Sequence, residues 1–372
     1  MKVLVVNAGS SSVKLRVVDD GDQLLASRDL GPADDGFAEQ LGDFVNDAGA
    51  IDVVGHRVVH GGSRFTSAAL VDADVRDALD GLTELAPLHN PRALAGIDAA
   101  ARLLFGVPQV VCFDTAFHAS LPPAATTYAI PQDWVARWGI RRFGFHGISC
   151  AWASRRAVEM LGRPADGLRL VICHLGAGAS ATGLSGGLSA DTTMGFTPLE
   201  GLVMATRCGD LGPGALLFAL EHGLQVAEAS EDLEHHSGLL GIAGTTGDMR
   251  QLIAARAAGD QTAELAIAVY QHRLRAKIAG MAAATAGTDA LVFTGGVGEG
   301  SAIVRAETCA DLDWMGVTLD REANNAVGAA DAEISDPIAS VRTLVIHARE
   351  DLQIAHECRQ LLAHQQTSAG SA

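Results

Sequence analysis

The chain begins, at residues 1–20, with the sequence MKVLVVNAGSSSVKLRVVDD. Two apolar runs, Val3 to Val6 and Val13 to Val18, indicate β-strands, and mostly small residues join them. A two-residue turn is enough to close a β-hairpin. A longer turn with several hydroxyl groups has a conformational entropy cost that a bound group would offset. The stretch therefore predicts a hairpin whose turn holds a ligand.

The same pattern recurs at residues 168–187, LRLVICHLGAGASATGLSGG. A third small-residue turn follows at residues 290–300, where a strand runs into the glycines of ALVFTGGVGEG. Strand-like runs alternate with helical patterns along the rest of the chain, which is typical of an α/β protein. The repeat predicts two related domains, with two unrelated hairpins as the alternative.

Composition excludes several classes of protein. The formal net charge of -17 argues against binding to nucleic acid or to anionic membranes. No uninterrupted apolar run is long enough for a membrane span, and no secretory signal is apparent, so we expect a cytoplasmic protein. The six cysteines contain no C-x-x-C pair and are expected to be free thiols.

The small-residue turns fit a bound nucleotide, although neither a Walker A motif nor a G-x-G-x-x-G fingerprint is present. In the first hairpin, the hydroxyl groups of Ser10 and Ser12 are expected to face phosphate oxygens, with Lys14 supplying a positive charge. Arg57 lies among apolar residues in a strand-like run, where a cation without a partner would be costly. We therefore expect an anion beside Arg57.

Eight motifs in order along the chain resemble those of the acetate kinases, in the acetate and sugar kinase, Hsc70 and actin superfamily. They are NAGSSSVK, GHRVVHGG, LAPLHNP, FDTAFH, RRFGFHGIS, CHLGAGAS, DTTMGFTPLEGLVMATRCGD and FTGGVGEG. The resemblance implies an α/β, two-domain actin-like ATPase (ribonuclease H-like) fold with an interdomain active-site cleft. We expect a first domain at residues 1–150, joined by a C-terminal helix at about 352–372, and a nucleotide-binding domain at 151–351.

The implied reaction is the reversible transfer of a phosphoryl group from ATP to acetate, which gives acetyl phosphate and ADP. The resemblance also implies Mg²⁺, with Mn²⁺ as a substitute, and a homodimer. Acetate is deprotonated at neutral pH, so the reaction needs no general base. It needs cations and fixed donors, because two anions approach one another and charge spreads over the transferring group.

Site residues carry over from the resemblance motif by motif. Arg57 is implied to hold the acetate carboxylate, and His146 and Arg207 to stabilise the transition state. Asp114 is the implied catalytic acidic residue, which we expect to orient Arg207 or a metal-bound group. His89 is implied to lie near the substrate, or it caps the helix that follows. The implied methyl pocket consists of Val59, Leu88, Phe145 and Pro198.

On the nucleotide side, the resemblance adds three segments to Ser10, Ser12 and Lys14. These are His174, Leu175, Gly176, Ala177 and Gly178; Asp248, Met249 and Arg250; and Gly296, Val297, Gly298, Glu299 and Gly300. The implied metal ligands are Asn7 and Glu350, with Asp351 as an alternative to Glu350.

The chain departs from the family pattern at four positions. Ala177 and Gly300 each replace an asparagine, Cys150 replaces a histidine, and Arg349 precedes Glu350 in an altered segment, IHAREDL. Because three of the four changes lie on the nucleotide or metal side, we expect altered nucleotide selectivity, with GTP or another phosphoryl donor as the alternative to ATP.

Two further hypotheses remain open. One is a short-chain acyl kinase that acts on propionate or butyrate. The other is a nucleotide-binding regulatory or chaperone-like relative that has lost catalysis. The presence of both Arg57 and Arg207 argues against the second, because a protein that only binds nucleotide does not need a clamp for acetate.

Overall fold

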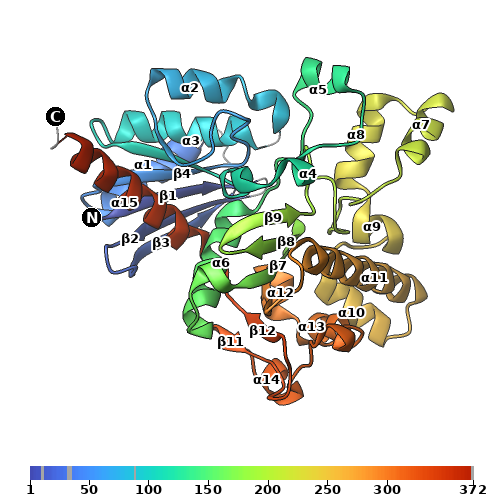
Figure 1. Cartoon of the computed structure of the whole chain (residues 1–372). Helices are drawn as coiled ribbons and strands as arrows, with labels where there is room; N and C mark the ends of the chain where they lie inside the picture. The colour runs from blue at the N-terminus through green and yellow to red at the C-terminus, as the bar shows by residue number, and fades with distance from the viewer. Residues whose placement is uncertain (10–11, 32–35, 88, 370–372) are drawn as a thin grey trace. The chain divides into compact units, whose positions relative to one another are not determined.

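Two six-stranded sheets form the framework of the computed structural model, which describes residues 1–9, 12–31, 36–87 and 89–369 (Figure 1). The strands of the first sheet, in spatial order, are β3 (Leu24–Leu30), β2 (Val13–Val18), β1 (Val3–Ala8), β4 (Val53–Val58), β6 (Gln109–Phe113) and β5 (Ala69–Leu70). Those of the second are β9 (Leu188–Thr192), β8 (Ala179–Ser185), β7 (Arg169–Leu175), β10 (Ala290–Thr294), β12 (Arg342–Val345) and β11 (Ala332–Glu333).

The two sheets share one pairing pattern. In each, an antiparallel meander of three strands continues into two parallel strands and ends in a short antiparallel edge strand. The hairpins β1–β2 and β7–β8, which the sequence marked as a repeat, occupy equivalent places in the two sheets. The predicted two-domain α/β architecture is therefore confirmed.

The chain divides into two units, whose bounds differ from the expected domains at residues 120–144 and at two short stretches, 151–152 and 349–351. The first unit contains Met1–Ala119, Phe145–Trp152 and Arg349–Ala372, and the second contains Ser120–Gly144 and Ala153–Ala348. The sequence assigned residues 120–144 to the first domain, but they pack with the second unit. The C-terminal helix belongs to the first unit.

In the first unit, helices cover both faces of the sheet. α1 (Phe37–Ala48) and α3 (Asn90–Leu103) bury one face in a core with alternate residues of β1 and β2. α15 (Glu350–Ala369) packs on β1 and β4, so closely that a Cβ atom on Gly55 would lie 2.6 Å from Ile354. The remaining elements here are α2 (Ala73–Asp80) and the 3-10 helix η1 (Thr83–Leu85), while η2 (Ala116–Ser120) and α6 (Gly147–Leu161) contain residues of both units.

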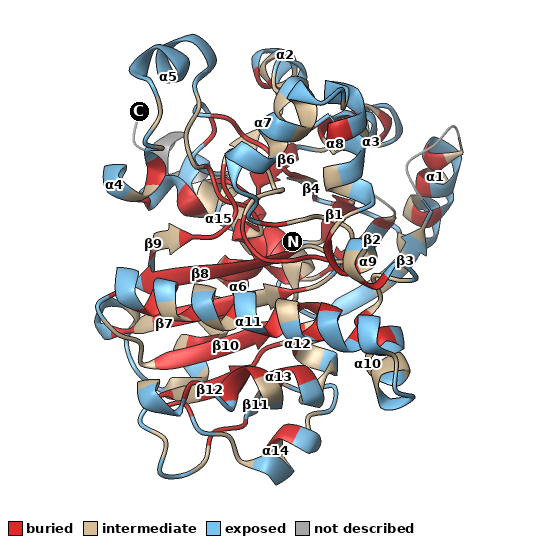
Figure 2. Ribbon diagram, turned by 90° about the vertical axis from the view of Figure 1, so that its right-hand side faces the viewer, coloured by how far each residue is buried: buried red, intermediate tan, exposed pale blue. Residues whose placement is uncertain are grey.

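In the second unit, strands β7, β8 and β10 are almost entirely buried (Figure 2). The long helix α11 (Gln261–Ala284) packs on β7 and β8, where Gly183 leaves room for the Met281 carbonyl. The other helices are α4 (Pro123–Thr126), α5 (Gln132–Trp138), α7 (Pro213–Glu221), α8 (Val226–His235), α9 (Gly238–Ala243), α10 (Met249–Ala257), α12 (Gly295–Gly300), α13 (Ala302–Cys309) and α14 (Arg321–Asn325), with η3 (Ala165–Gly167) and η4 (Asp313–Met315).

Two expectations from composition can be compared with the structure. All six cysteines are free, and only Cys208 is not buried, as expected for reduced thiols. Within the described residues, none of the helices has both the length and the apolar character that crossing a membrane requires.

Two histidines of the first unit are buried, and burial lowers the pKa of both His56 and His118 from 6.5 to about 4. Between pH 6.5 and about pH 4, both rings are protonated in the unfolded chain but neutral in the folded chain. We therefore expect each ring to remove roughly 3 kcal/mol from the free energy of unfolding as the pH falls through this window. Urea unfolding from pH 7 to pH 4 measures the loss. The double variant His56→Gln, His118→Gln should lose less stability over the same range, and an unchanged pH dependence contradicts the assignment.

Candidate active site

A polar cluster lies at the carboxyl ends of the parallel strands of the first unit. Asn7 is in β1, Arg57 is in β4, and Asp114 directly follows β6. Arg57 Nε donates to both carboxylate oxygens of Asp114 at 3.2 Å, and Nη2 donates to Asp114 Oδ2 at 2.5 Å. Arg57 Nη1 donates to Asn7 Oδ1 at 3.2 Å. The anion expected beside Arg57 is therefore Asp114 of the protein itself.

Glu350, at the start of α15, completes this cluster. Asn7 Nδ2 donates to Glu350 Oε2 at 2.7 Å, and Arg57 Nη1 lies 3.9 Å from the same oxygen. Asp351 instead accepts hydrogen bonds from Arg349, at 3.0 Å from Nε and 2.9 Å from Nη2. The sequence left open whether Glu350 or Asp351 is the metal ligand, and Glu350 is the one that lies in the cluster. We name Asn7, Arg57, Asp114 and Glu350 the arginine cluster.

The charges of the arginine cluster depend on one another. Burial lowers the pKa of Arg57, but the attraction of Asp114 and Glu350 outweighs it, so the pKa of Arg57 is raised. Burial also raises the pKa of Asp114, and Glu350 adds to this effect, while Arg57 opposes it. Asp114 is only 1% exposed, so its ionised form depends on Arg57. Asp114 thus pairs with Arg57 of its own unit, and the expectation that it orients Arg207 or a metal-bound group stays a prediction.

His146 lies in a tight turn with a left-handed backbone, at φ +57°. Its neighbour Phe145 is buried, and the ring of Phe145 packs edge-to-face on the ring of His60, with centroids 5.4 Å apart. Of the other residues expected in the methyl pocket, Val59 is buried just after β4, Pro198 belongs to the second unit, and Leu88 lies outside the described residues. The composition of this pocket stays a prediction.

His89 occupies the N-cap position of α3, but its side chain makes no capping hydrogen bond. The helix begins at Asn90 itself, one residue earlier than an Asn90 cap would place it. The Asn90 side chain donates to the carbonyl oxygens of His60 and Leu82 instead. His89 therefore does not cap the helix through its side chain, and its position near the substrate stays a prediction.

The first hairpin turn is described only in part, because Ser10 lies outside the described residues. The turn is closed by a hydrogen bond of 2.8 Å from Gly9 N to Ser12 O. Lys14 pairs with Asn7 across the hairpin, and its side chain is exposed. Lys14 is therefore on the strand next to the arginine cluster.

The second unit contains a cavity of about 860 Å³, which we name the large cavity. Its walls bring together eight of the predicted nucleotide-site residues from three distant segments: Gly176, Ala177, Asp248, Met249, Arg250, Gly296, Val297 and Gly300. Most of the other side chains that line it are apolar, including Leu239, Ile253 and Tyr270. Such a lining with a few polar groups is typical of small-molecule sites.

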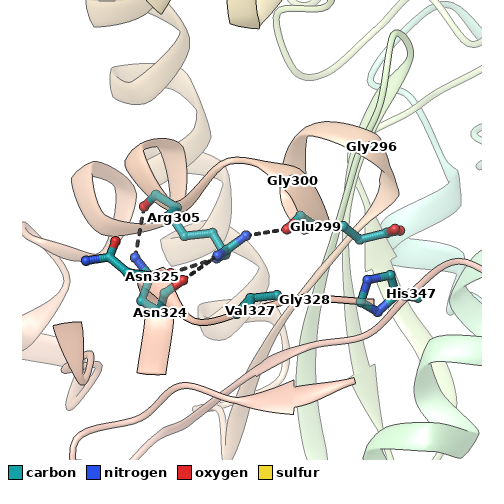
Figure 3. Close-up of a pocket in the computed structure, with 10 residues that line it drawn as sticks. Gly296, Glu299, Gly300, Arg305, Asn324, Asn325, Val327, Gly328 and His347 are labelled. Atoms are coloured by element: carbon teal, nitrogen blue, oxygen red, sulfur yellow. Dashed lines mark hydrogen bonds between the residues drawn. The ribbon is translucent and has the colours of Figure 1, made fainter. Parts of the chain in front are cut away.

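Within the three predicted nucleotide segments of the second unit, five residues do not line the large cavity: His174, Leu175, Gly178, Gly298 and Glu299. The Glu299 side chain holds two backbone segments together: its Oε1 accepts hydrogen bonds from the N–H groups of Gly295 at 2.7 Å and Ala348 at 2.9 Å. It lines a smaller cavity of about 380 Å³, beside the buried Arg305 (Figure 3). Arg305 donates to the carbonyl oxygens of Gly298 and Glu299 and so anchors the end of α12.

The glycine-rich segment after β10 is the short helix α12, whereas the sequence indicated a turn. Gly295 begins it at φ +79°, and a Cβ atom there would lie 2.8 Å from the carbonyl oxygen of Leu175. Only glycine fits this conformation at this distance.

Arg207 lies in the second unit and is mostly buried. Its Nε is 3.4 Å from Glu234 Oε2, and its Nη1 donates to the carbonyl oxygen of Pro198 at 3.2 Å. Burial lowers the pKa of Arg207, and the attraction of Glu234 opposes this. Arginine remains charged in proteins, so Arg207 supplies a fixed cation.

Some residues that line the large cavity had no clear signal in the sequence. Thr206 directly precedes Arg207 inside a quoted motif, and Gly247 directly precedes Asp248, so each is the neighbour of a predicted site residue. Tyr270 comes from α11, far along the chain from every motif. Only the packing of α11 on the sheet brings it to the cavity.

Oxygen donors of the arginine cluster match the preference of Mg²⁺ for hard ligands. The Glu350 carboxylate fits this role. Asn7 Oδ1 accepts from Arg57, so a cation that used this oxygen would replace Arg57 there. Within the described residues, no group of three or more His, Cys, Asp or Glu side chains is placed to hold a metal. With Glu350 and Asn7 as its protein ligands, a bound Mg²⁺ would keep several water ligands.

Comparison with known proteins gives consistent matches along the chain. The model of the acetokinase family matches residues 35–356. An acetate kinase from Synechococcus sp. (strain JA-2-3B'a(2-13)) is 44% identical over 97% of this chain and 99% of its own length.

Solved structures agree with these matches. The crystal structure of Porphyromonas gingivalis acetate kinase superimposes with a TM-score of 0.90 at 35% identity, and covers 97% of this chain and 99% of its own. A propionate kinase from Francisella tularensis subsp. tularensis SCHU S4 gives a TM-score of 0.88 at 34% identity, and covers 96% of this chain and 98% of its own.

Proposed function

The chain belongs to the acetokinase family, and we propose that it transfers the γ-phosphoryl group of ATP reversibly to acetate, which gives acetyl phosphate and ADP. It is a phosphotransferase with a carboxyl group as acceptor, and ATP and a divalent metal ion are the family's requirements. The observation that carries the proposal is the 44% identity to an acetate kinase over 97% of the chain.

Acetate binding is assigned to Arg57. Its hydrogen bonds to Asp114 and Asn7 use Nε–H and one N–H of each terminal nitrogen. The other N–H groups of the two terminal nitrogens lie on one edge of the guanidinium group. This edge can donate two parallel hydrogen bonds to a carboxylate. In this assignment Asp114 orients Arg57 and moves no proton, since acetate is already ionised at neutral pH.

Nucleotide binding is assigned to the large cavity, whose apolar walls suit a base and whose glycines let a ligand approach the backbone closely. Phosphoryl transfer depends mainly on positioning and on charge stabilisation. We assign these tasks to His146 and Arg207, which supply donors to the transferring phosphoryl group. The proposal requires the acetate at Arg57 and the nucleotide in the large cavity to serve one reaction.

We assign Mg²⁺ to Glu350, with Asn7 as the second candidate ligand. The ion would neutralise charge on the phosphate oxygens when bound. The hydrogen bonds of Asn7 to Glu350 and Arg57 hold its side chain beside the Glu350 carboxylate at the carboxyl edge of the sheet.

Trapping of acyl phosphate with hydroxylamine tests the function directly. The assay combines acetate, propionate or butyrate with ATP or GTP and Mg²⁺. We expect acetyl hydroxamate with acetate and a slower reaction with propionate, since a missing or extra methylene changes binding by roughly 1–3 kcal/mol. Propionate as the better substrate would favour the second candidate, which the similarity to the Francisella propionate kinase supports. Nucleotide binding without hydroxamate from any acid would refute the kinase activity.

Weak discrimination between ATP and GTP is expected of the large cavity. Ala177 and Gly300 both line it, and at both positions the family's usual asparagine amide is missing. Each lost hydrogen bond weakens binding by about 1 kcal/mol. Restoring the amides in the double variant Ala177→Asn, Gly300→Asn should lower the KM for ATP and increase the preference over GTP. Ordinary saturation by ATP and a strong preference over GTP in the wild type would contradict this expectation.

We further propose a cytoplasmic homodimer whose contact includes α7. No residue of this apolar helix is buried, and Leu217 and Phe218 are 58% and 62% exposed. An apolar surface of this kind is typical of an interface. Light scattering should give a dimer for the wild type and a monomer for the double variant Leu217→Glu, Phe218→Glu. The control Trp314→Glu, at an exposed single aromatic, should remain dimeric. A monomeric wild type contradicts the proposal.

A further inference from the structure

His146 has a backbone conformation that few residues adopt. Its φ is +57°, and only Asp22 and Ala286 also have a positive φ among the non-glycine residues that the structure describes. In this conformation the Cβ atom crowds the backbone carbonyl. A residue stays there only where its surroundings hold it, and such residues gather at functional sites.

Two hydrogen bonds hold the peptide groups on either side of His146. His118 Nε2 lies 2.9 Å from the carbonyl oxygen of Phe145, and the N–H of Gly147 donates to the carbonyl oxygen of Asp114 at 2.9 Å. A Cβ atom on Gly147 would lie 2.2 Å from the same Asp114 oxygen, so the contact requires glycine. The segment that follows β6 thus fixes the turn at both ends.

His118 is well suited to this contact. Its ring is 1% exposed and packs edge-to-face on the ring of Phe117, with centroids 5.6 Å apart. A carbonyl oxygen only accepts hydrogen bonds, so Nε2 must carry a proton. Because burial lowers the pKa of His118 to about 4, the ring is neutral at pH 7 and holds this proton on Nε2.

We infer that His118 is a positioning residue for phosphoryl transfer: by holding the Phe145 carbonyl, it fixes the backbone from which the His146 side chain projects. The inference rests on the role assigned to His146 in the proposed function. His118 itself needs no contact with substrate. Without this hydrogen bond the turn can relax, and a displacement of about 1 Å at a catalytic group can lower turnover on the order of 100-fold.

Two amide variants of His118 distinguish a role in positioning His146 from a role in packing alone. The amide nitrogen of glutamine reaches about as far as histidine Nε2, whereas that of asparagine reaches only as far as Nδ1. We expect His118→Gln to keep kcat within a few-fold of wild type. We expect His118→Asn to lower kcat by about 100-fold, with the KM values for acetate and nucleotide nearly unchanged. Equal kcat values in the two variants, whether high or low, overturn the inference.

His56 provides a matched control. It is equally buried in the same unit, burial lowers its pKa to about 4, and its Nε2 lies 2.7 Å from the Gln109 amide rather than near His146. His56→Asn should destabilise the fold, as measured by urea unfolding, and should keep the wild-type kcat. A kcat loss in His56→Asn equal to that in His118→Asn would assign both losses to general destabilisation and overturn the inference.

A second readout does not depend on activity. Nitrogen-15 NMR of the imidazole rings should show His118 as the neutral tautomer with its proton on Nε2. The tautomer with its proton on Nδ1 cannot donate to Phe145 and overturns the inference. If the wild type forms no acyl phosphate, the proposed function fails while the NMR result still tests the His118 contact. If the wild type is active and the amide variants do not differ, the inference alone fails.

Discussion

Arg57→Met is expected to unfold more easily than the wild type and to form almost no acetyl phosphate. Its partner Asp114 is 1% exposed, so the variant leaves a buried carboxylate without its counter-charge. Removing one partner of a buried ion pair costs about 3–5 kcal/mol of stability. Loss of one electrostatic contact to the reacting groups lowers turnover on the order of 100- to 1,000-fold. Urea unfolding and the hydroxamate assay measure the two effects.

The double variant Arg57→Met, Asp114→Asn separates the loss of stability from the loss of turnover. Asp114→Asn removes the unpaired charge, so the double variant should regain much of the lost stability and remain inactive. Wild-type turnover in either variant that lacks Arg57 would refute its assignment to acetate.

Arg76 offers a matched control for Arg57. It also binds a carboxylate through two nitrogens, with Nε and Nη2 each 2.9 Å from Asp98. That pair is more exposed, at 30% and 41% of the side chains, and exposed pairs contribute about 1 kcal/mol or less. Arg76→Met should therefore change neither stability nor activity much, and a large stability loss there would mean that burial is not what distinguishes the two pairs.

Arg207→Ala is expected to lower kcat on the order of 100- to 1,000-fold, with smaller changes in both KM values. The reason is the loss of a fixed cation that opposes charge developing on the transferring phosphoryl group. Arg207→Lys keeps the charge but not the planar donors, so we expect only partial recovery. Single-turnover measurements with saturating acetate isolate the chemical step.

Arg256 is the control for Arg207, because it lies in the same unit and pairs with Glu307 at 2.7 Å. Arg256→Ala should remain close to wild type in kcat. A folded Arg207→Ala variant within a few-fold of wild-type turnover would remove Arg207 from the catalytic assignment.

Most strands could be predicted from local pattern, and the least predictable elements depended on contacts distant in sequence. β1 and β7 are buried apolar runs next to small-residue turns, which is why the repeat was visible. The helix α12 was missed because glycine disfavours helices. Contacts with Leu175, Glu299 and Arg305 override this preference.

Motifs identified most candidate residues but not their partners. The sequence placed Asn7 and Glu350 together only through the family resemblance, since 343 positions separate them. It proposed Arg207 or a metal-bound group as the partner of Asp114, and did not indicate the ion pair with Arg57 that the structure shows. His118 was part of a recognised motif, and nothing in the motif indicated that its ring holds the Phe145 carbonyl.

The sequence by itself determined the α/β class, the repeated hairpin, the family and the residue types that the chemistry needs. These follow from local periodicity and from motifs, in which neighbours along the chain carry the information. Only the tertiary structure decided which charges meet, because parallel strands bring Asn7, Arg57 and Asp114 to one edge of a sheet and α15 adds Glu350 from the other end of the chain. The free energy of a buried ion pair depends on distance and burial, and both arise only when the strands pair.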